Sequence, residues 1–143
     1  MIFIAGSIIL LSAVSVAIAL FAASDEPETY AAGTPEFAIQ QYIETVRDRD
    51  VDAAYEMLSS NAQRDVSRSE LRDFIRHSFL YDPDWRIRLT DVTVSGDRAT
   101  VELTTEYTGG GPLDLNRYTE KHIIPLVLEE REWKIDDPFI GWW

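Results

Sequence analysis

The stretch from Thr34 to Ser59, TPEFAIQQYIETVRDRDVDAAYEMLS, predicts two consecutive helices at the start of a folded domain. Thr34 is a favourable N-cap, Pro35 suits the first helical position, and Glu36 places an acid in the first turn. Apolar residues then recur at spacings of three and four, as on one buried helix face. They are Ala38, Ile39, Tyr42, Ile43 and Val46 in the first helix, which runs to about Arg49, and Val51, Ala54, Tyr55 and Leu58 in the second, which ends near residues 59–61.

A third helix is predicted to begin at Ser67 or Ser69, because either serine can cap a helix and Glu70 supplies an acid for the first turn. The apolar spacing of three and four continues after these residues, so this helix also has one buried face. That face is formed by Leu71, Phe74, Ile75 and Ser78.

The apolar period changes from 3.6 to 2 at Trp85, where apolar residues begin to alternate with polar ones. Ser95-Gly96-Asp97 predicts a hairpin turn from this first strand into a second one over residues 100–107. Further strands are predicted over residues 118–128 and 133–135. Three helices followed by about four antiparallel strands favour an α+β domain over residues 34–143, with the helices packed on one face of a curved sheet.

The first 23 residues, MIFIAGSIILLSAVSVAIALFAA, carry no charge and predict a transmembrane anchor. As a helix they would be roughly 33–35 Å long, enough to cross a hydrocarbon core of about 30 Å. A cleaved secretory signal is the alternative, because Ala17-Ile18-Ala19 fits the small-x-small cleavage pattern. Against it, no Lys or Arg precedes the apolar run, which is longer than the core of a typical signal.

The anchor would insert in the lipid bilayer and make this a single-pass protein of the cell membrane. Residues 24–33, SDEPETYAAG, are polar, acidic and without an apolar period, so they predict a flexible linker between bilayer and domain. We expect the C-terminal domain to lie outside the cytoplasm, as in most single-anchor chains with this layout.

The charge and the residue composition exclude several classes of function. The chain has 13 Lys and Arg against 25 Asp and Glu, a net charge of −12, which disfavours binding to nucleic acid. The lack of cysteine excludes disulfides and thiolate zinc sites. Two distant histidines, His77 and His122, give no metal-ligand cluster, and residues 109–112 lack the Lys-Ser/Thr of a phosphate loop. We therefore expect no metal and no cofactor.

The order of the predicted elements resembles the nuclear transport factor 2-like superfamily, a cystatin-like α+β cone. The likeness is carried by Pro35, Ala38, Tyr42, Ile43, Val46, Asp50, Ala54, Tyr55, Leu58 and Ser59, and by the closing strand Trp133-Lys134-Ile135-Asp136. The sequence is most similar to small membrane-tethered or secreted members. The superfamily contains ketosteroid isomerase, polyketide cyclases and dehydratases, but also members that only bind or dimerise, so the resemblance does not fix an activity.

The resemblance implies that a catalytic member would hold a carboxylate, a histidine or a tyrosine in an apolar pocket inside the cone. His122 and Glu120 are two residues apart in the predicted strand 118–128, so they project to the same side and are candidates for an acid/base pair. Asp91, which follows the first strand, is a third candidate, although an aspartate at a strand end is commonly a turn residue.

Five aromatic residues are candidates for the lining of a pocket. Tyr42 and Tyr55 lie on apolar helix faces and could point inward, or they could be core tyrosines whose hydroxyls bind the backbone. Trp85, Tyr107 and Trp133 lie on the predicted strands and could close the cone.

The C-terminal residues 139–143, Phe-Ile-Gly-Trp-Trp, are too apolar to be left in water. They could pack on the domain, contact a partner protein or lie at the bilayer surface.

Two classes of function therefore remain for a membrane-anchored domain outside the cytoplasm. The first is a non-catalytic ligand-binding or protein-interaction module, with a partner protein or a second copy on the sheet face. The second is a small isomerase-, cyclase- or dehydratase-like enzyme with a buried carboxylate or histidine as general base. An enzyme needs a titratable group in an open pocket, whereas a binding or structural domain can have a cone filled by aromatic residues.

Overall fold

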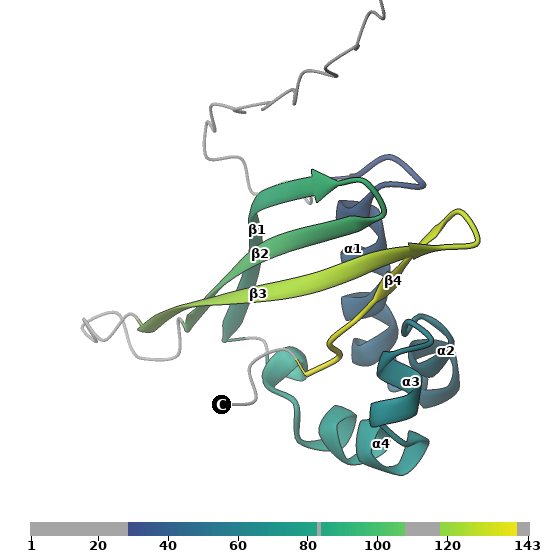
Figure 1. The fold of residues 1–143 in the computed structure, drawn as a ribbon. Helices are drawn as coiled ribbons and strands as arrows, with labels where there is room; N and C mark the ends of the chain where they lie inside the picture. The colour runs from purple at the N-terminus through teal and green to yellow at the C-terminus, as the bar shows by residue number, and fades with distance from the viewer. Residues whose placement is uncertain (1–28, 83, 108–117, 140–143) are drawn as a thin grey trace, which may run out of the picture.

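The computed structural model describes residues 29–82, 84–107 and 118–139. The predicted α+β fold with one antiparallel sheet is confirmed, and helices and strands are segregated along the chain (Figure 1). In chain order the elements are α1 (Pro35–Arg47), α2 (Val51–Glu56), α3 (Ala62–Asp65), α4 (Arg68–His77), the 3₁₀ helix η1 (Phe79–Tyr81), β1 (Trp85–Ser95), β2 (Arg98–Tyr107), β3 (Tyr118–Glu129) and β4 (Glu132–Ile135).

Helix α1 begins and ends with hydrogen-bonded caps. The Thr34 hydroxyl accepts a hydrogen bond from the backbone N–H of Phe37 (3.3 Å), as its sequence position predicts. At the other end, the N–H of Arg49 donates to the Val46 carbonyl (3.0 Å) and that of Asp50 to the Thr45 carbonyl (3.2 Å). This is a Schellman motif, and Arg49 occupies its left-handed position with φ of 59°, where glycine is the usual residue.

The second predicted helix ends earlier than expected, at Glu56, and the short α3 over Ala62–Asp65 is an additional helix, so the prediction of three helices was wrong. Between α2 and α3 the chain turns its backbone toward β4. The Ser59 N–H donates to the Ile135 carbonyl (2.8 Å), and the Ile135 N–H donates to the Met57 carbonyl (3.0 Å). These bonds form a short parallel bridge between Leu58 and Ile135 that a continuous helix could not make.

Helix α4 starts at the first of the two predicted caps, Ser67. The Ser67 hydroxyl accepts from the Glu70 N–H, and the Glu70 carboxylate accepts from the Ser67 N–H (2.8 Å), which together form a capping box. These bonds to Ser67 lower the pKa of the Glu70 carboxyl below its ordinary value. The helix ends at His77, and Ser78 then caps η1.

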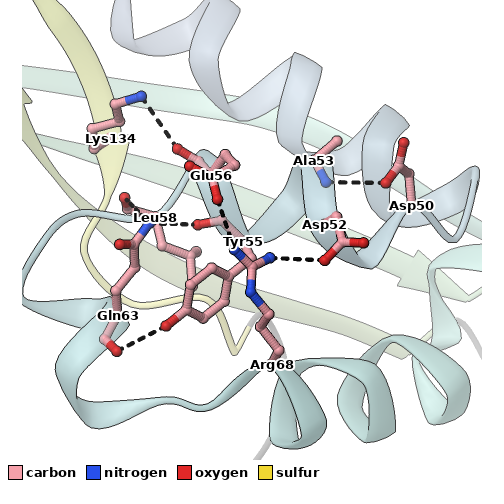
Figure 2. A network of polar contacts seen from close by, with 9 residues as sticks. All are labelled: Asp50, Asp52, Ala53, Tyr55, Glu56, Leu58, Gln63, Arg68 and Lys134. Carbon is pink, nitrogen blue, oxygen red and sulfur yellow. Dashed lines mark hydrogen bonds and ion pairs between the residues drawn. The ribbon is translucent and has the colours of Figure 1, made fainter.

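Arg68 ties α4 to α2 (Figure 2). Its guanidinium donates to the carboxylates of Asp52 and Glu56, each at 2.8 Å, and lies 4.1 Å from the centre of the Tyr55 ring. The Tyr55 hydroxyl in turn donates to the Gln63 carbonyl (3.0 Å) in α3. The network therefore fixes the three short helices relative to one another, at one end of the sheet in Figure 1.

The sheet is a meander with the strand order β1-β2-β3-β4. The β1–β2 hairpin turns at Gly96-Asp97, as predicted, with Gly96 at φ of 62°. The β3–β4 turn uses Glu130 and Arg131, both at positive φ (50° and 72°), which is the pattern of a type I′ turn built without glycine. Strand β1 carries an irregularity between Leu89 and Asp91, where Thr90 is the extra residue of a bulge.

The hydrophobic core lies between α1 and the face of the sheet that α1 covers, called here the inner face (Figure 1). Alternate strand residues contribute to it, including Val101, Leu103, Ile124 and Leu126. After β4 the chain continues along the helices, where Pro138 is buried and the Phe139 ring packs edge-on against Phe74 with ring centres 5.4 Å apart. The part of the apolar tail that is described thus packs on the domain, and residues 140–143 lie outside the described residues.

The predicted anchor over residues 1–23 and the first half of the linker, residues 24–28, also lie outside the described residues. In the part of the chain that the structure describes, no helix is long and apolar enough to cross a membrane.

Candidate functional site

His122 is the one histidine that the described part of the core encloses. It lies on the inner face of β3 with 4% of its surface exposed. Its Nε2 atom is 3.1 Å from the hydroxyl oxygen of Thr105, which lies on the neighbouring strand β2 and is fully buried. Its Nδ1 atom is buried and has no hydrogen-bond partner among the described residues. A buried polar atom without a partner is rare and costs stability, so it calls for an explanation.

Glu120 lies on the same side of β3 as His122, as the spacing of two predicts. Its carboxylate oxygen is 3.9 Å from His122 Nε2, and its side chain is 41% exposed. The sequence analysis missed Thr105, which stands between the two: its hydroxyl donates to the Glu120 carbonyl (3.4 Å) and also contacts His122. A hydroxyl in the apolar alternation of β2 was the signal that could have found it.

A group of aromatic residues, Phe79, Trp85 and Tyr107, lies beside His122 at the end of the sheet where β1 begins and β2 ends. The Phe79 ring of η1 lies 6.3 Å from the imidazole and 4.8 Å from Trp85, measured between ring centres. Trp85 also lies 5.2 Å from Tyr107, its partner across the β1–β2 pair. Two of the predicted pocket residues, Trp85 and Tyr107, are thus brought together with the predicted histidine.

Asp91 does not join this group. The bulge at Thr90 adds one residue to β1 and reverses the alternation that Trp85, Ile87 and Leu89 begin. Val92 therefore takes the inward position, and Asp91 is exposed opposite Glu102 on the outer face of the sheet.

The two predicted tyrosines use their hydroxyls on the backbone. The Tyr42 hydroxyl donates to the Pro138 carbonyl (3.1 Å), and that of Tyr55 donates to the Gln63 carbonyl. Burial, with a smaller contribution from the charge of Asp137, raises the pKa of Tyr42 far above its ordinary value. A phenol held neutral in this way stabilises the fold, and its proton is not available for acid/base exchange near neutral pH.

Trp133 lies at the other end of the sheet. It pairs with Leu128, whereas Tyr107 pairs with Tyr118, ten residues away along β3 or roughly 33 Å. Trp133 therefore packs on the core from β4 and does not close the same opening as Trp85 and Tyr107.

Large side chains of the described residues pack in the interior of the domain. The core side chains with no more than 2% of their surface exposed are Ile39, Tyr42, Val46, Ala54, Leu58, Leu71, Phe74, Ile75, Leu80, Val101, Leu103, Leu126 and Ile135. Within the described residues, no group of three or more His, Cys, Asp and Glu side chains could hold a metal ion.

An open hollow of about 500 Å³ lies at the edge of the aromatic group, beside the C-terminal end of α1. It is lined by Arg47, Arg49, Leu80, Tyr81, Asp82 and Trp85. Burial raises the pKa of the Tyr81 phenol, and the neighbouring Arg49 guanidinium opposes this shift. The sequence analysis did not identify this hollow.

The outer face of the sheet is largely polar. Arg88 pairs with Glu106 (3.7 Å) and Lys121 with Glu102 (2.8 Å), while Ile123 is an apolar side chain that stands 66% exposed among them. The predicted interface on this face is not tested by these contacts and stays a prediction.

Comparison with known proteins gives one family and a set of similar structures. The model of the SnoaL-like domain matches residues 39–123. No curated protein matches the chain. A SEC-C motif containing protein from Rhodopseudomonas palustris is 18% identical, with a TM-score of 0.56 over 76% of this chain and 79% of that one.

Two further structures are similar at lower identity. A SEC-C motif containing protein from Psychrobacter arcticus is 13% identical, with a TM-score of 0.55 over 81% of this chain and 66% of that one. A protein from Thiobacillus denitrificans, named as a calcium/calmodulin-dependent protein kinase type II association domain, is 11% identical, with a TM-score of 0.53 over 71% and 89%. At these identities the three structures show a shared fold alone.

Proposed function

Because the chain belongs to the family of SnoaL-like domains in the nuclear transport factor 2-like superfamily, we propose that it is a non-catalytic binding module of that fold. The membership confirms the resemblance that the sequence carries, but the superfamily includes both enzymes and binding domains, so the role must be argued from the site. The observation that favours binding is the packed core of the described residues: its large side chains are buried against one another, and the hollow that the structure describes lies at its edge, beside the end of α1.

A ligand would then be held at the edge of the aromatic group, where the structure has a hollow. Its volume of about 500 Å³ is within the range of small-molecule sites. Trp85 supplies a half-buried apolar wall, and the polar groups around it can fix the orientation of a small molecule.

The proposal includes the place of the domain in the cell. Residues 1–23 would anchor the chain in the bilayer and display the domain outside the cytoplasm, as their apolar and uncharged composition favours. Protease added to intact cells that produce the full chain is expected to degrade the domain and to leave a cytoplasmic control protein whole. A domain that is degraded only after lysis contradicts this orientation.

The binding role is tested with the full chain in lipid nanodiscs and a library of small cyclic and aromatic compounds. Ligand-observed NMR identifies the compounds that bind, and mass spectrometry after a long incubation identifies any that are converted. A binding module is expected to return every bound compound unchanged. Conversion of a bound compound by the unaltered chain, absent in a heat-inactivated control, contradicts the proposal.

An isomerase-, cyclase- or dehydratase-like enzyme is the second candidate, and His122 favours it. The imidazole of His122 is buried beside Thr105 and Glu120, and one of its ring nitrogens has no partner among the described residues. A histidine in this arrangement can act as a general base. If conversion is found, His122→Gln is expected to abolish it, because glutamine retains a polar side chain but does not take up a proton near neutral pH. Lys121→Gln, on the opposite side of the same strand, is the control that is expected to retain the conversion.

A further inference from the structure

We infer that the hollow beside the end of α1 binds a small organic anion with a flat apolar body, and that Arg47 and Arg49 hold its negative charge. The inference rests on the proposed binding role and specifies the class of ligand. It is carried by three observations: two positioned guanidinium groups, a strained backbone at one of them, and an aromatic wall beside both.

The guanidinium of Arg47 is held by the chain itself. Its Nε–H donates to the Leu80 carbonyl (3.0 Å) in η1, which fixes the side chain across the edge of the hollow. This bond uses one of the five N–H donors of the group. Arg47 makes no ion pair with an acidic residue within the described ranges, so its terminal nitrogens remain for a ligand.

The guanidinium of Arg49 is positioned by an aromatic ring. Its central carbon lies 4.7 Å from the centre of the Tyr81 ring, and Tyr81 lines the same hollow. A guanidinium that stacks on a ring can still pair its N–H edge with the two oxygens of a carboxylate. Two arginines that are already positioned lose little conformational freedom when an anion binds.

The backbone at Arg49 has a left-handed conformation that is unfavourable for arginine. Its φ of 59° lies in the left-handed region, at the position of the Schellman motif that glycine fills without penalty. An arginine there lowers the stability of the end of α1. Such strain is often found where a side chain serves a function, and the Arg49 side chain lines the hollow.

Two of the acidic residues next to these arginines, Asp48 and Asp50, do not line the hollow. The Asp50 carboxylate caps α2 through the Ala53 N–H (3.0 Å), and Asp48 is exposed and is not a lining residue. Asp82 lines the hollow, and its Oδ1 accepts from the Asp84 N–H (2.9 Å). Its other oxygen can accept a hydrogen bond from a hydroxyl or amine of the ligand, so the site would distinguish the two ends of such a molecule.

Trp85 gives the site its preference for a flat molecule. Its indole lines the hollow and contacts the Phe79 ring, at 4.8 Å between ring centres. A planar ring that stacks on this indole places a carboxylate substituent toward the arginines. The ligand class is therefore an aromatic or cyclic carboxylate.

Isothermal titration calorimetry on the full chain in nanodiscs tests the inference with three probes. The probes are 2-naphthoate, its neutral amide 2-naphthamide, and inorganic phosphate as an anion without an apolar body. We expect naphthoate to bind at least about 10-fold more tightly than the amide and than phosphate, and its binding to weaken as salt is added.

Two variants and one matched control locate the site. Arg47→Gln and Arg49→Gly are each expected to weaken naphthoate at least about 10-fold and to leave the amide unchanged. Arg49→Gly is also expected to raise the melting temperature by about 4 °C, because glycine relieves the left-handed strain. Arg72→Gln, an exposed arginine of α4 that is not a lining residue, is expected to change neither quantity.

The outcomes separate the inference from the binding role. If the amide binds as tightly as naphthoate, the assigned ligand class is wrong and the binding role stands. If naphthoate binds equally well to all three variants, the assigned place is wrong. If no probe binds, the inference is overturned, and the library screen described above decides the binding role independently.

Discussion

Replacing His122 by leucine tests whether this buried histidine lowers the stability of the domain. In the unaltered protein the Nδ1 atom is buried and has no hydrogen-bond partner among the described residues. Leucine has a similar volume and no polar atom, so it removes the unpaired group from the core. We expect His122→Leu to raise the free energy of unfolding rather than to lower it.

The magnitude follows from two opposing contributions. An unpaired buried polar atom costs about 1–3 kcal/mol, whereas the hydrogen bond between His122 Nε2 and Thr105 contributes about 1 kcal/mol. After the substitution Thr105 keeps its bond to the Glu120 carbonyl, at 3.4 Å, so no new unpaired group is created. The net change is a gain of about 1 kcal/mol.

The companion variant Thr105→Val is expected to have the opposite effect. It leaves both imidazole nitrogens of His122 without a partner in this part of the core and lowers the free energy of unfolding by about 1–2 kcal/mol. In the double variant most of this loss disappears, because there is no imidazole left to satisfy. A double-mutant cycle should therefore give a coupling energy of about 1–2 kcal/mol.

Urea unfolding of the full chain in detergent micelles, followed by tryptophan fluorescence, measures the four proteins of the cycle. Ile124→Val, a buried position on the same strand, is the control and is expected to lose about 0.5–1.5 kcal/mol. A loss of more than about 1 kcal/mol in His122→Leu, with the control behaving as expected, refutes the reasoning. Zero coupling to Thr105 refutes the assigned hydrogen bond.

Three further predictions concern the stability of the fold. Tyr42→Phe should lower the free energy of unfolding by about 1 kcal/mol at neutral pH, because the bond to the Pro138 carbonyl is lost. Because burial raises the pKa of Tyr42, the free energy of unfolding of the unaltered protein should fall by about 1.4 kcal/mol per pH unit above about pH 10, where the tyrosine of the unfolded chain ionises first. If the variant keeps this alkaline slope in urea titrations, the assignment is contradicted. Glu130→Asn combined with Arg131→Gly should raise the free energy of unfolding by about 1–2 kcal/mol, because both residues have positive φ; no gain in thermal melts would mean that the turn is not strained. Arg68→Gln should lower the melting temperature, and part of this loss should persist at about 1 M salt. Salt screens the ion pairs of Arg68 but affects its contact with the Tyr55 ring less. A loss of melting temperature that vanishes in salt contradicts the ring contact.

The elements that the sequence predicts well are those with local causes. The start of α1 depends on Thr34 and Pro35, and the start of α4 on Ser67 and Glu70, all within one helical turn. The β1–β2 turn depends on Gly96 alone. The break between α2 and α3 has a distant cause, since it depends on backbone bonds from Met57 and Ser59 to Ile135 in the last strand. No local pattern contains that information.

The same distinction applies to the candidate site. Glu120 and His122 lie on one side of a strand because the period of a strand is two, which the sequence shows. Their contact with Thr105 depends on the register of β2 against β3, in which Thr105 pairs with Glu120. Asp91 was misplaced because one extra residue at Thr90 reverses the alternation, and nothing in the apolar pattern marks a bulge.

Two sites in the backbone have non-glycine residues at positive φ, the β3–β4 turn and Arg49, and we expect substitution at each to have a different effect on binding. Glu130 and Arg131 lie in an exposed turn and do not line the hollow beside α1, so glycine and asparagine should improve stability there without affecting binding. Arg49 has the same left-handed conformation but reaches the one hollow described beside α1. Substituting glycine should therefore raise stability at both places and weaken the binding of a carboxylate only at Arg49. A chain in which both substitutions stabilise and neither affects binding would show that left-handed residues in this fold are not retained for a ligand.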